Sequence, residues 1–448
     1  MNYDVIFIGS GHATWHAAVA LKQAGKQVAI VEKDLVGGTC TNYGCDAKIA
    51  LDGPFQLTEQ LQRFQGHGVN SVPTIDWPAL MAYKHNVIDP LAPTMSQLFT
   101  KMGIDLLTGA AKIADAHTVR IGDQTYTSDY IVIGTGQRPA TLPISGNEYI
   151  HDSREFLDLP EMPQRLVFIG AGVIAMEFTA MAATMGREVH IVEFGDRALG
   201  AFNQTYVAKL QAKLEAQGVQ FHFNEAVTEV SATDDTYTVT TKSGLTIDAD
   251  YVLGATGRVA NVENLGLEDL NIEASARGIK VNDHLQTTVP NIFVSGDVID
   301  KVQPKLTPTA TFESNYIART ILGNTDPISY PAIPSVVFTM PRLAEVGVNA
   351  AEAEAHADLY RTQVVPFGQQ LAFEFKLALD AEATLVFDKA GYLVGASLYA
   401  DDGDDLVNLL TLIINAHFTV DQLQQQIFAF PSATSGVIDL LGTLLPRG

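Results

Sequence analysis

Two glycine-rich turns of matching design constrain the fold of this chain more than any other feature. The turns read Gly9-Ser10-Gly11-His12-Ala13-Thr14 and Gly170-Ala171-Gly172-Val173-Ile174-Ala175, and each lies between a short apolar run and a helix-like segment. In each unit a second apolar run ends in a carboxylate, Glu32 or Glu193, 23 residues after the first glycine. Such glycines let the backbone approach a pyrophosphate at a helix N-terminus, and such a carboxylate accepts hydrogen bonds from ribose hydroxyls.

The repeat predicts two Rossmann-type domains that bind two different dinucleotides, most economically a resident flavin and a diffusible nicotinamide. One unit alone would be a weak signal, because glycine-rich turns also occur in other α/β folds. The first unit carries Thr14 where glycine or alanine is usual, which crowds the packing of helix on strand. We expect the first dinucleotide to contact Gly9, Gly11 and Glu32. The second is expected to contact Gly170, Gly172, Ala175 and Glu193.

The composition excludes several classes of protein. The chain has 448 residues, of which 47% are hydrophobic, so it can bury large cores and is not disordered. It has 51 acidic and 28 basic residues, and the net charge of −23 argues against nucleic-acid or anionic-membrane partners. No apolar run approaches the length of a membrane-spanning helix, and the sequence begins without a basic leader. We therefore expect a cytoplasmic protein.

The pattern changes along the rest of the chain. Residues 77–107 are expected to be largely helical, with a break near Pro90 and Pro93. From about Ser335, alternating strand-like and helix-like segments without a further glycine fingerprint predict a separate α+β domain. The acidic run at 401–405 is expected to be a solvated helix start.

The only two cysteines of the chain, Cys40 and Cys45, lie close together just after the first unit. One helical turn and a loop can span the four residues between them, so the spacing suits a reversible disulfide. A helix that begins near Cys45 would place its positive end against a thiolate and lower the thiol pKa. Lys48 would return to the same helical face as Cys45. The alternative is a pair of buried structural thiols.

Residues 37–48 resemble the active-site signature of the flavin-dependent pyridine nucleotide-disulfide oxidoreductases, the family of glutathione reductase, lipoamide dehydrogenase and mercuric reductase. The resemblance covers essentially the whole chain. It is also carried by Thr135-Gly136 with Pro139, the Gly170 turn followed by Glu177, Thr256-Gly257-Arg258, Gly296-Asp297, Leu306-Thr307-Pro308 and Val336-Val337-Phe338-Thr339.

The resemblance implies an α/β fold with two Rossmann-type dinucleotide-binding domains and a C-terminal α+β dimerisation domain. The FAD-binding domain would comprise residues 1–148 and 259–330, the NAD(P)-binding domain residues 149–258, and the dimerisation domain residues 331–448. The protein would be a homodimer that binds FAD, takes electrons from NADH or NADPH, and needs no metal site. Its partner would be a small-molecule disulfide or another electron acceptor.

The resemblance also implies roles for individual residues. In this family NAD(P)H reduces FAD, FAD reduces the disulfide, and the dithiol reduces an acceptor. Cys45 would contact the flavin and Cys40 would attack the acceptor. Lys48 and Glu177 would pair where the nicotinamide docks. The remaining cofactor-binding residues of the resemblance would be Gly9, Gly11, Glu32, Thr39, Thr135, Gly136, Gly257, Gly296, Asp297 and Thr307.

One part of the family pattern is missing near the C-terminus. Relatives protonate the leaving thiolate with a histidine–glutamate pair in a His-Pro-Thr-x-x-Glu-like motif, donated across the dimer interface. Here Phe430 stands at the histidine position and no carboxylate stands at the glutamate position. General acid–base catalysis typically contributes ~10²–10⁴-fold, so this contribution is missing or relocated. The nearest histidine in sequence, His417, is expected on the surface, and the extra C-terminal cysteine pair of mercuric reductase is absent.

The second unit favours NADH over NADPH as the electron donor. Glu193 would accept hydrogen bonds from the ribose hydroxyls of NADH and repel the 2′-phosphate of NADPH. Ala175 in the third fingerprint position, together with Arg187 and Arg197 nearby, leaves NADPH possible.

Three functions remain open from the sequence. The first is an NAD(P)H-dependent flavin reductase of a small or accessible disulfide. The second uses the same flavin and dithiol to reduce a metal ion, a quinone or oxygen, acceptors that need no protonation of a leaving thiolate. The third is a redox-sensing flavoprotein with little turnover, whose disulfide state is read by a partner.

Overall fold

The structure is a computed structural model that describes residues 2–234 and 236–447. The first glycine-rich unit forms a β-α-β motif in which β1 (Asn2–Ile8) and β2 (Val28–Glu32) are parallel and α1 (Trp15–Gln23) connects them. These strands belong to a seven-stranded sheet in the order β3-β2-β1-β6-β5-β4, with β18 paired to β6. The other strands of this sheet are β3 (Asp105–Thr108), β4 (Ala111–Asp115), β5 (Thr118–Ile121), β6 (Gln124–Ile133) and β18 (Ile292–Val294).

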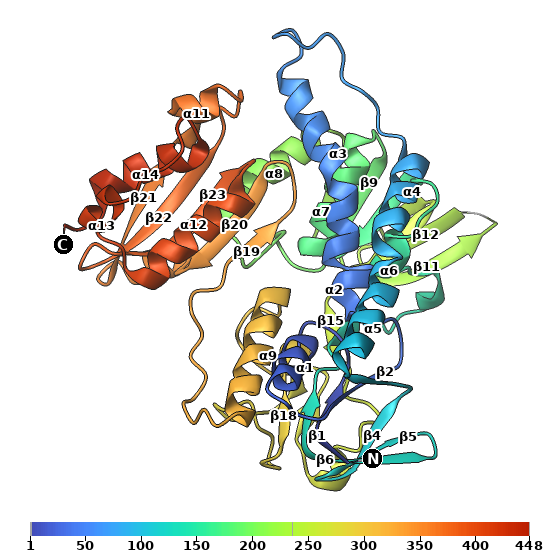
Figure 1. Cartoon of the computed structure of the whole chain (residues 1–448). Coiled ribbons are helices and arrows are strands. Elements are labelled where there is room, and N and C mark those ends of the chain that lie inside the picture. The colour runs from blue at the N-terminus through green and yellow to red at the C-terminus, as the bar shows by residue number, and fades with distance from the viewer. Residues whose placement is uncertain (1, 235, 448) are drawn as a thin grey trace.

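The first domain is completed by chain that lies far away in sequence. Strand β1 reads as a continuous apolar run because both of its faces are covered, and Val5, Ile6 and Phe7 are fully buried. Helix α9 (Thr307–Ile321) packs beside α1, where the Ser314 hydroxyl accepts a hydrogen bond from the Ala17 amide at 3.0 Å. Figure 1 shows α1 and α9 side by side.

The second glycine-rich unit repeats this arrangement in a smaller sheet. Four parallel strands follow the order β10-β9-β8-β14, and α7 (Val173–Thr184) connects β8 to β9. The strands are β8 (Arg165–Ile169), β9 (Glu188–Glu193), β10 (Gln220–Phe223) and β14 (Tyr251–Gly254). Two helices, α6 (Ser153–Phe156) and α8 (Gln204–Ala216), and a three-stranded antiparallel sheet, β11 (Val227–Thr233), β12 (Thr236–Thr241) and β13 (Thr246–Ala249), complete this region.

Two short antiparallel strands join the two domains. Strand β7 (Gln137–Pro139) follows the turn at Thr135-Gly136 and pairs with β15 (Arg258–Ala260), which follows the turn at Thr256-Gly257. A further hairpin consists of β16 (Ala274–Ser275) and β17 (Gly278–Ile279). These two turns, which lie about 120 residues apart in sequence, are therefore neighbours in space.

The segment between the units contains α2 (Gly38–Tyr43), α3 (Cys45–Arg63), α4 (Trp77–Ile88) and α5 (Leu91–Met102). The expected break lies at Asp89–Pro90, whereas Pro93 lies in the first turn of α5, where a backbone N–H is not needed. The expectation of helix up to residue 107 was wrong at its end, because Gly103 stops α5 in a left-handed conformation and residues 105–108 form β3.

The C-terminal region is the predicted separate α+β domain. Its five-stranded antiparallel sheet follows the order β19-β20-β23-β22-β21. The strands are β19 (Ser335–Val337), β20 (Arg342–Gly347), β21 (Tyr360–Val365), β22 (Glu382–Asp388) and β23 (Leu393–Ala400). The helices are α10 (Ala350–Ala355), α11 (Leu371–Glu374), α12 (Gly403–Ala416), α13 (Val420–Gln424) and α14 (Ala433–Leu444). The predicted fold class is confirmed.

Two features of the C-terminal domain bear on its contacts. Large apolar side chains remain exposed on it, namely Leu371, Phe375, Leu379, Leu412, Ile427 and Phe430. The expectation of a solvated acidic run was wrong for Asp401, which is buried and pairs with Arg63 of α3.

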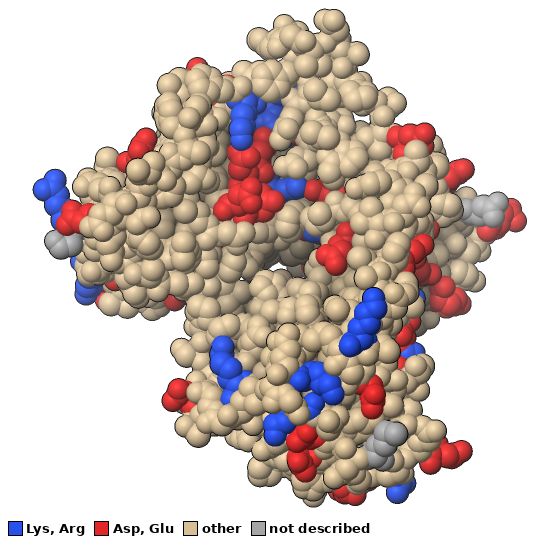
Figure 2. All heavy atoms as spheres, in the orientation of Figure 1, with Lys and Arg blue, Asp and Glu red and all other residues tan. Residues whose placement is uncertain are grey.

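Figure 2 shows the face of the molecule hollowed between the C-terminal domain and the first domain. No helix in the described part of the chain is long and apolar enough to cross a membrane.

Candidate active site

A cavity of about 750 Å³ lies where β1, β2 and β6 end, the edge at which parallel sheets commonly bind ligands. Its wall combines the first glycine-rich turn, the cysteine segment (residues 37–45), the turn after β6 (residues 134–136) and the start of α9. Many of the predicted site residues line it: Gly9, Gly11, Glu32, Thr39, Cys40, Cys45, Thr135, Gly136, Asp297 and Thr307.

Glu32 is fixed at the end of β2 by four donors. Its Oε2 accepts hydrogen bonds from the Ser10 amide at 3.0 Å and the Ser10 hydroxyl at 2.6 Å. Its Oε1 accepts from the amides of Lys33 at 2.8 Å and Asp34 at 2.9 Å. The carboxylate is therefore held in one orientation at the cavity wall, as a ribose-binding group needs to be.

The first glycine-rich turn is tight and also accommodates Thr14. Gly9 has a φ of +102°, and a Cβ there would lie 2.4 Å from the carbonyl oxygen of Gly134. The Thr14 hydroxyl donates to the carbonyls of Gly9 at 2.7 Å and Gly11 at 2.9 Å. The crowding expected from Thr14 is relieved by Gly134, where a Cβ would lie 2.3 Å from the Thr14 methyl group.

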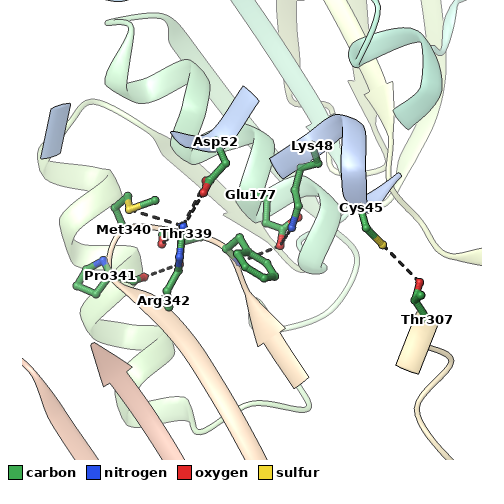
Figure 3. A network of polar contacts seen from close by, with 10 residues as sticks. Cys45, Lys48, Asp52, Glu177, Thr307, Thr339, Met340, Pro341 and Arg342 are labelled. Atoms are coloured by element: carbon green, nitrogen blue, oxygen red, sulfur yellow. Dashed lines mark hydrogen bonds and ion pairs between the residues drawn. The ribbon is translucent and has the colours of Figure 1, made fainter. Parts of the chain in front are cut away.

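Helices α2 and α3 bring the two cysteine sulfurs into hydrogen-bond contact. The predicted helix start is confirmed, because α3 begins at Cys45 with Gly44 as its N-cap. The Sγ of Cys45 lies 3.5 Å from the Oγ1 of Thr307 at the start of α9, and Figure 3 shows Cys45 pointing at that residue. The cysteine pair therefore lies between two helix N-termini, a setting that favours a thiolate.

The two thiols divide a single proton unequally. A hydrogen bond from Cys40 lowers the pKa of Cys45 to about 6, against the opposing effect of burial, with further help from Thr307 and Lys48. The hydrogen bond with Cys45, together with burial, raises the pKa of Cys40 well above its usual range. Of the two thiols, Cys45 is therefore the one that more readily becomes the thiolate, and Cys40 the one that more readily keeps its proton.

Lys48 and Glu177 form the predicted ion pair behind the cysteines. The Nζ of Lys48 lies 2.9 Å from the Oε1 of Glu177 in α7, and the two side chains are 11% and 6% exposed. The pair connects the cysteine helix to the second dinucleotide domain. Neither residue lines the cavity of the first unit, so they lie behind its wall rather than in it.

The second unit places its four predicted residues around the turn between β8 and α7. Gly170 has a φ of +105°, and a Cβ there would lie 2.6 Å from the carbonyl oxygen of Ala255. Gly172 is the N-cap of α7 and Ala175 is fully buried in that helix. Glu193 at the end of β9 accepts hydrogen bonds from the amides of Ala171 at 2.7 Å and Gly195 at 2.6 Å.

Two predicted glycines, Gly257 and Gly296, lie outside the lining of the cavity. Gly296 has a φ of +80°, and its amide donates to Glu313 at 2.7 Å, so it shapes the turn that presents Asp297. Gly257 has a φ of +112° and precedes Arg258, whose side chain does line the cavity. Burial raises the pKa of Asp297, an effect that Lys301 and Arg258 oppose.

Sequence reasoning missed several residues that the structure brings to the site. Arg258 stood in a quoted motif, yet its guanidinium was not singled out. Asp52 and Arg342 form a buried ion pair next to Lys48, and no local motif marks them because they are 290 residues apart. Phe338, whose ring lies 3.7 Å from the Nζ of Lys48, likewise comes from the start of the C-terminal domain.

A histidine pair at the start of α1 was also missed. His12 lines the same cavity as the cysteines, and its Nδ1 lies 3.2 Å from the Nε2 of His16. Burial lowers the pKa of His12, while Asp46 acts in the opposite direction. Burial and His12 lower the pKa of His16 to about 4, so both imidazoles are neutral at pH 7. The spacing of four residues within the fingerprint was the signal that could have revealed them.

Phe430 and Ser435 stand at the two positions of the family's acid–base pair. Phe430 is 81% exposed, and Ser435 lies in the first turn of α14, where its amide donates to Ser432. His417 ends α12 in a left-handed conformation with its side chain exposed, as expected. Among the described residues, no cluster of three or more histidine, cysteine, aspartate or glutamate side chains could hold a metal ion.

The residues present fit FAD in the first cavity. Glu32 is aligned for an adenosine ribose and Gly11 meets Gly38 so closely that a Cβ on Gly38 would lie 2.9 Å from the Cα of Gly11. That close approach leaves a narrow backbone cradle for a pyrophosphate. The cysteine pair and Thr307 line the same cavity. These features define the class of protein: a dithiol oxidoreductase that uses a flavin and a nicotinamide dinucleotide.

Comparison with known proteins agrees with this class. Residues 3–314 match the family described as pyridine nucleotide-disulphide oxidoreductase, and residues 333–439 match the dimerisation domain of that family. The chain therefore belongs to the pyridine nucleotide-disulphide oxidoreductases. It is an FAD-dependent disulfide oxidoreductase, and members of this family use NAD(H) or NADP(H).

Individual relatives span almost the whole chain. A dihydrolipoyl dehydrogenase of Bacillus subtilis is 33% identical over 444 residues, covering 96% of this chain and 93% of the relative. A glutathione reductase of Pisum sativum is 28% identical and covers 98% and 82%, respectively. The solved structure of the HOCl-induced flavoprotein disulfide reductase RclA from Escherichia coli superimposes with a TM-score of 0.88 at 26% identity, covering 99% of this chain and 100% of RclA. RclA has also been solved as a Cu(II) complex.

Proposed function

We propose that this protein is an NADH-dependent reductase of a small disulfide, in which Cys45 keeps the thiolate and Cys40 reacts with the acceptor. The observation that carries the proposal is the cysteine pair in hydrogen-bond contact at the cavity wall, with Cys45 against Thr307. FAD, when bound in this cavity, would take a hydride from the nicotinamide and pass two electrons to the disulfide.

The thiol chemistry follows from the unequal sharing of the proton. When Cys40 attacks a disulfide RSSR, its proton passes to the Cys45 thiolate, a mixed disulfide forms and RS⁻ leaves. Cys45 then attacks the Sγ of Cys40 after losing that proton, and the second RS⁻ leaves. The sum is one dithiol and one RSSR converted to one protein disulfide and two RSH. With Cys45 already a thiolate, the cysteines release one proton, which one leaving thiolate takes up, and the other leaving thiolate takes a proton from water.

The second unit supports NADH as the donor. The fixed carboxylate of Glu193 suits ribose hydroxyls. Arg197, one of the two arginines near Glu193 in sequence, is bound by Asp196 through two contacts of 2.7 Å. Arg197 thus already has a carboxylate partner, and Asp196 would repel a phosphate.

A small disulfide acceptor would be reduced without the imidazole that relatives donate across the dimer. We propose that two copies associate through the exposed apolar residues of the C-terminal domain, as the matched dimerisation domain suggests. Phe430 would then stand where relatives place the histidine. Phe430 cannot transfer a proton, so each leaving thiolate would be released unprotonated. The rate with a disulfide would therefore depend on pH through the pKa of the acceptor's own thiol.

The test measures NADH oxidation with small disulfides, Cu(II), quinones and oxygen, using the wild-type protein and the variants C40S and C45S. Rapid turnover with disulfides that C40S abolishes, with FAD still bound, supports the proposal. A long-wavelength thiolate–flavin absorption band on anaerobic reduction should persist in C40S and vanish in C45S. Full disulfide reductase activity in C40S would overturn the role of Cys40. Negligible turnover with every acceptor would leave a redox sensor.

A metal ion is the second candidate acceptor. Two observations favour it: Phe430 supplies no proton for a leaving thiolate, and the neutral imidazoles of His12 and His16 lie beside the dithiol cavity. The similar protein RclA is known as a Cu(II) complex. Reduction of two Cu(II) ions by one dithiol yields two Cu(I) ions, a disulfide and two protons, so no thiolate has to leave.

A gain-of-function variant separates the two acceptors. The double variant F430H/S435E places an imidazole and a carboxylate at the positions that relatives use. If a disulfide is the acceptor, the variant should raise disulfide turnover by about tenfold or more, with Cu(II) turnover unchanged. The matched control is F430Y, which keeps an aromatic ring at the same site. An equal rise in both variants would contradict an acid–base explanation.

A further inference from the structure

The loop between β19 and β20, residues 338–341, touches the Lys48–Glu177 pair directly. The Phe338 amide donates to Glu177 Oε1 at 2.8 Å, the same oxygen that the Nζ of Lys48 binds at 2.9 Å. The Lys48 ammonium also lies 3.7 Å from the centroid of the Phe338 ring. Lys48 is therefore held between a carboxylate and an aromatic face, both of which attract a cation.

A buried ion pair holds this loop against the cysteine helix. Asp52 lies one turn beyond Lys48 on α3. Its Oδ2 accepts a hydrogen bond from the Nη2 of Arg342 at 2.5 Å, and its Oδ1 accepts one from Nη1 at 3.2 Å. The two side chains are 5% and 3% exposed. Figure 3 shows Asp52 extending toward Arg342 and Lys48 extending toward Glu177.

Arg342 also contacts two residues of the loop, Thr339 and Phe338. Its Nη1 donates to the carbonyl oxygen of Thr339 at 3.1 Å, and its guanidinium carbon lies 5.1 Å from the centroid of the Phe338 ring. The Thr339 hydroxyl in turn donates to the carbonyl of Pro341 at 2.7 Å. Arg342 therefore contacts both the ring of Phe338 and the backbone that follows it, next to the groups that contact Lys48 and Glu177.

A buried ion pair of this kind contributes little net stability compared with an apolar pair of the same shape, but it fixes geometry. We propose that Asp52 and Arg342 are positioning residues, which hold Phe338 in place and thereby set where the Lys48 ammonium stands beside the cysteine helix. The nicotinamide side of the reaction would then depend on a loop of the C-terminal domain. This inference rests on the predicted place of Lys48 and Glu177 at the flavin.

The chain offers a matched control on the same helix. Arg63, about three turns beyond Asp52 on α3, pairs with Asp401 of the C-terminal domain, whose side chain is 4% exposed. This pair also joins α3 to that domain through a buried aspartate. No contact of Arg63 or Asp401 with Phe338 or Lys48 occurs among the described residues. D401N therefore matches D52N in chemistry and burial but not in position.

The first test needs neither turnover nor flavin. The groups that act on the Cys45 thiol are Cys40, Thr307, Lys48 and Asp46, of which Lys48 lowers its pKa through its charge. In D52N we expect Arg342 to leave its place and Phe338 to shift, so that Lys48 keeps its contact with Glu177 but loses the aromatic face that helps to fix it. The pKa of Cys45, measured by the pH dependence of iodoacetamide alkylation of the reduced protein, should rise in D52N and remain unchanged in D401N.

The second test follows the flavin. In rapid mixing of the FAD-loaded protein with NADH, D52N should slow flavin reduction by about tenfold, because small misplacements of aligned groups are costly. D401N should react at the wild-type rate. This half-reaction involves no acceptor, so its outcome is independent of whether the proposed disulfide acceptor is correct. In a variant that bound no FAD, the pKa of Cys45 could still be measured by alkylation.

The double variant D52N/R342M separates positioning from stability. It leaves no buried charge unpaired, so its resistance to urea unfolding should return to near the wild-type level even if D52N alone is destabilised. The Cys45 pKa and the rate of flavin reduction should nevertheless remain altered. Equal effects of D52N and D401N, or full recovery of pKa and rate in the double variant, would overturn the proposal.

Discussion

The two dinucleotide units share a topology and a spacing, yet their surroundings differ. In the first unit, the turn at Gly11 faces a cavity of about 750 Å³ whose walls come from the cysteine segment and α9 as well. In the second unit, a Cβ on Gly172 would have no heavy atom within 4 Å, and Phe194 beside Glu193 is 80% exposed. The first site is enclosed and the second is open.

The two ribose carboxylates differ in the same sense. Glu32 accepts four hydrogen bonds, from two groups of Ser10 and from the amides of Lys33 and Asp34. Glu193 accepts two, from the amides of Ala171 and Gly195. A rigid, enclosed site suits a cofactor that stays bound, whereas an open site suits one that must leave after each turnover. The two units thus share one fold, and the residues that surround each glycine-rich turn determine how long its dinucleotide stays bound.

The largest effect should come from adding one methyl group at the equivalent glycines. Gly11 and Gly172 both lie outside the left-handed region, so G11A and G172A should fold. In G11A the new methyl group enters the cradle where Gly11 meets Gly38, and we expect the FAD dissociation constant to rise about 100-fold, about 2.7 kcal/mol. In G172A, FAD content should stay unchanged and only the KM for NADH should rise.

Flavin content after gel filtration and the KM for NADH measure these two effects. G9A serves as a reference for damage to the fold, because its Cβ would lie 2.4 Å from a carbonyl oxygen and its φ is +102°. Comparable loss of FAD in G11A and G172A would show that the contrast between an enclosed and an open unit is wrong.

A smaller effect should follow from changing the charge at the open site. In the double variant E193Q/D196N, the carboxylate no longer repels a 2′-phosphate, and Arg197 is released from its two contacts with Asp196. The ratio of kcat/KM for NADPH to that for NADH should rise by about tenfold. The wild type should prefer NADH. The corresponding E32Q change in the enclosed unit should alter FAD binding and leave this ratio unchanged, and a shift of the ratio in E32Q would contradict the assignment.

The sequence predicted most of the fold because its signals are local. A glycine turn between a strand and a helix, with a carboxylate after the next strand, is readable within about 30 residues. The start of α3 at Cys45 and the Lys48–Glu177 pair were predicted in the same way, from a helix face and a family resemblance. The ends of elements were less accurate, as at residue 107, because competing strand pairing decides them.

The parts that sequence could not predict are those formed by distant segments. Asp52 and Arg342 are separated by 290 residues, and the relief of Thr14 by Gly134 depends on the neighbouring strand. Asp401 lies in an acidic run that is typical of a solvated surface, yet Arg63 of α3 makes it a buried partner. Such pairings follow from tertiary packing, which leaves no periodic trace in a single sequence.

The smallest expected effect concerns how the open unit is anchored. Glu345 in β20 accepts a hydrogen bond from the amide of Asn203, the N-cap of α8, and burial raises its pKa to about 7 from 4.5. A carboxyl group whose folded pKa is raised stabilises the fold below the unfolded pKa, and that contribution is lost as pH rises through 7. The free energy of unfolding should therefore fall by about 1 kcal/mol between pH 6 and pH 8 on account of this group. In E345Q, urea unfolding should lose this pH dependence, whereas E354Q at an exposed position should retain it; the same slope in wild type and E345Q would show that Glu345 does not titrate in this range.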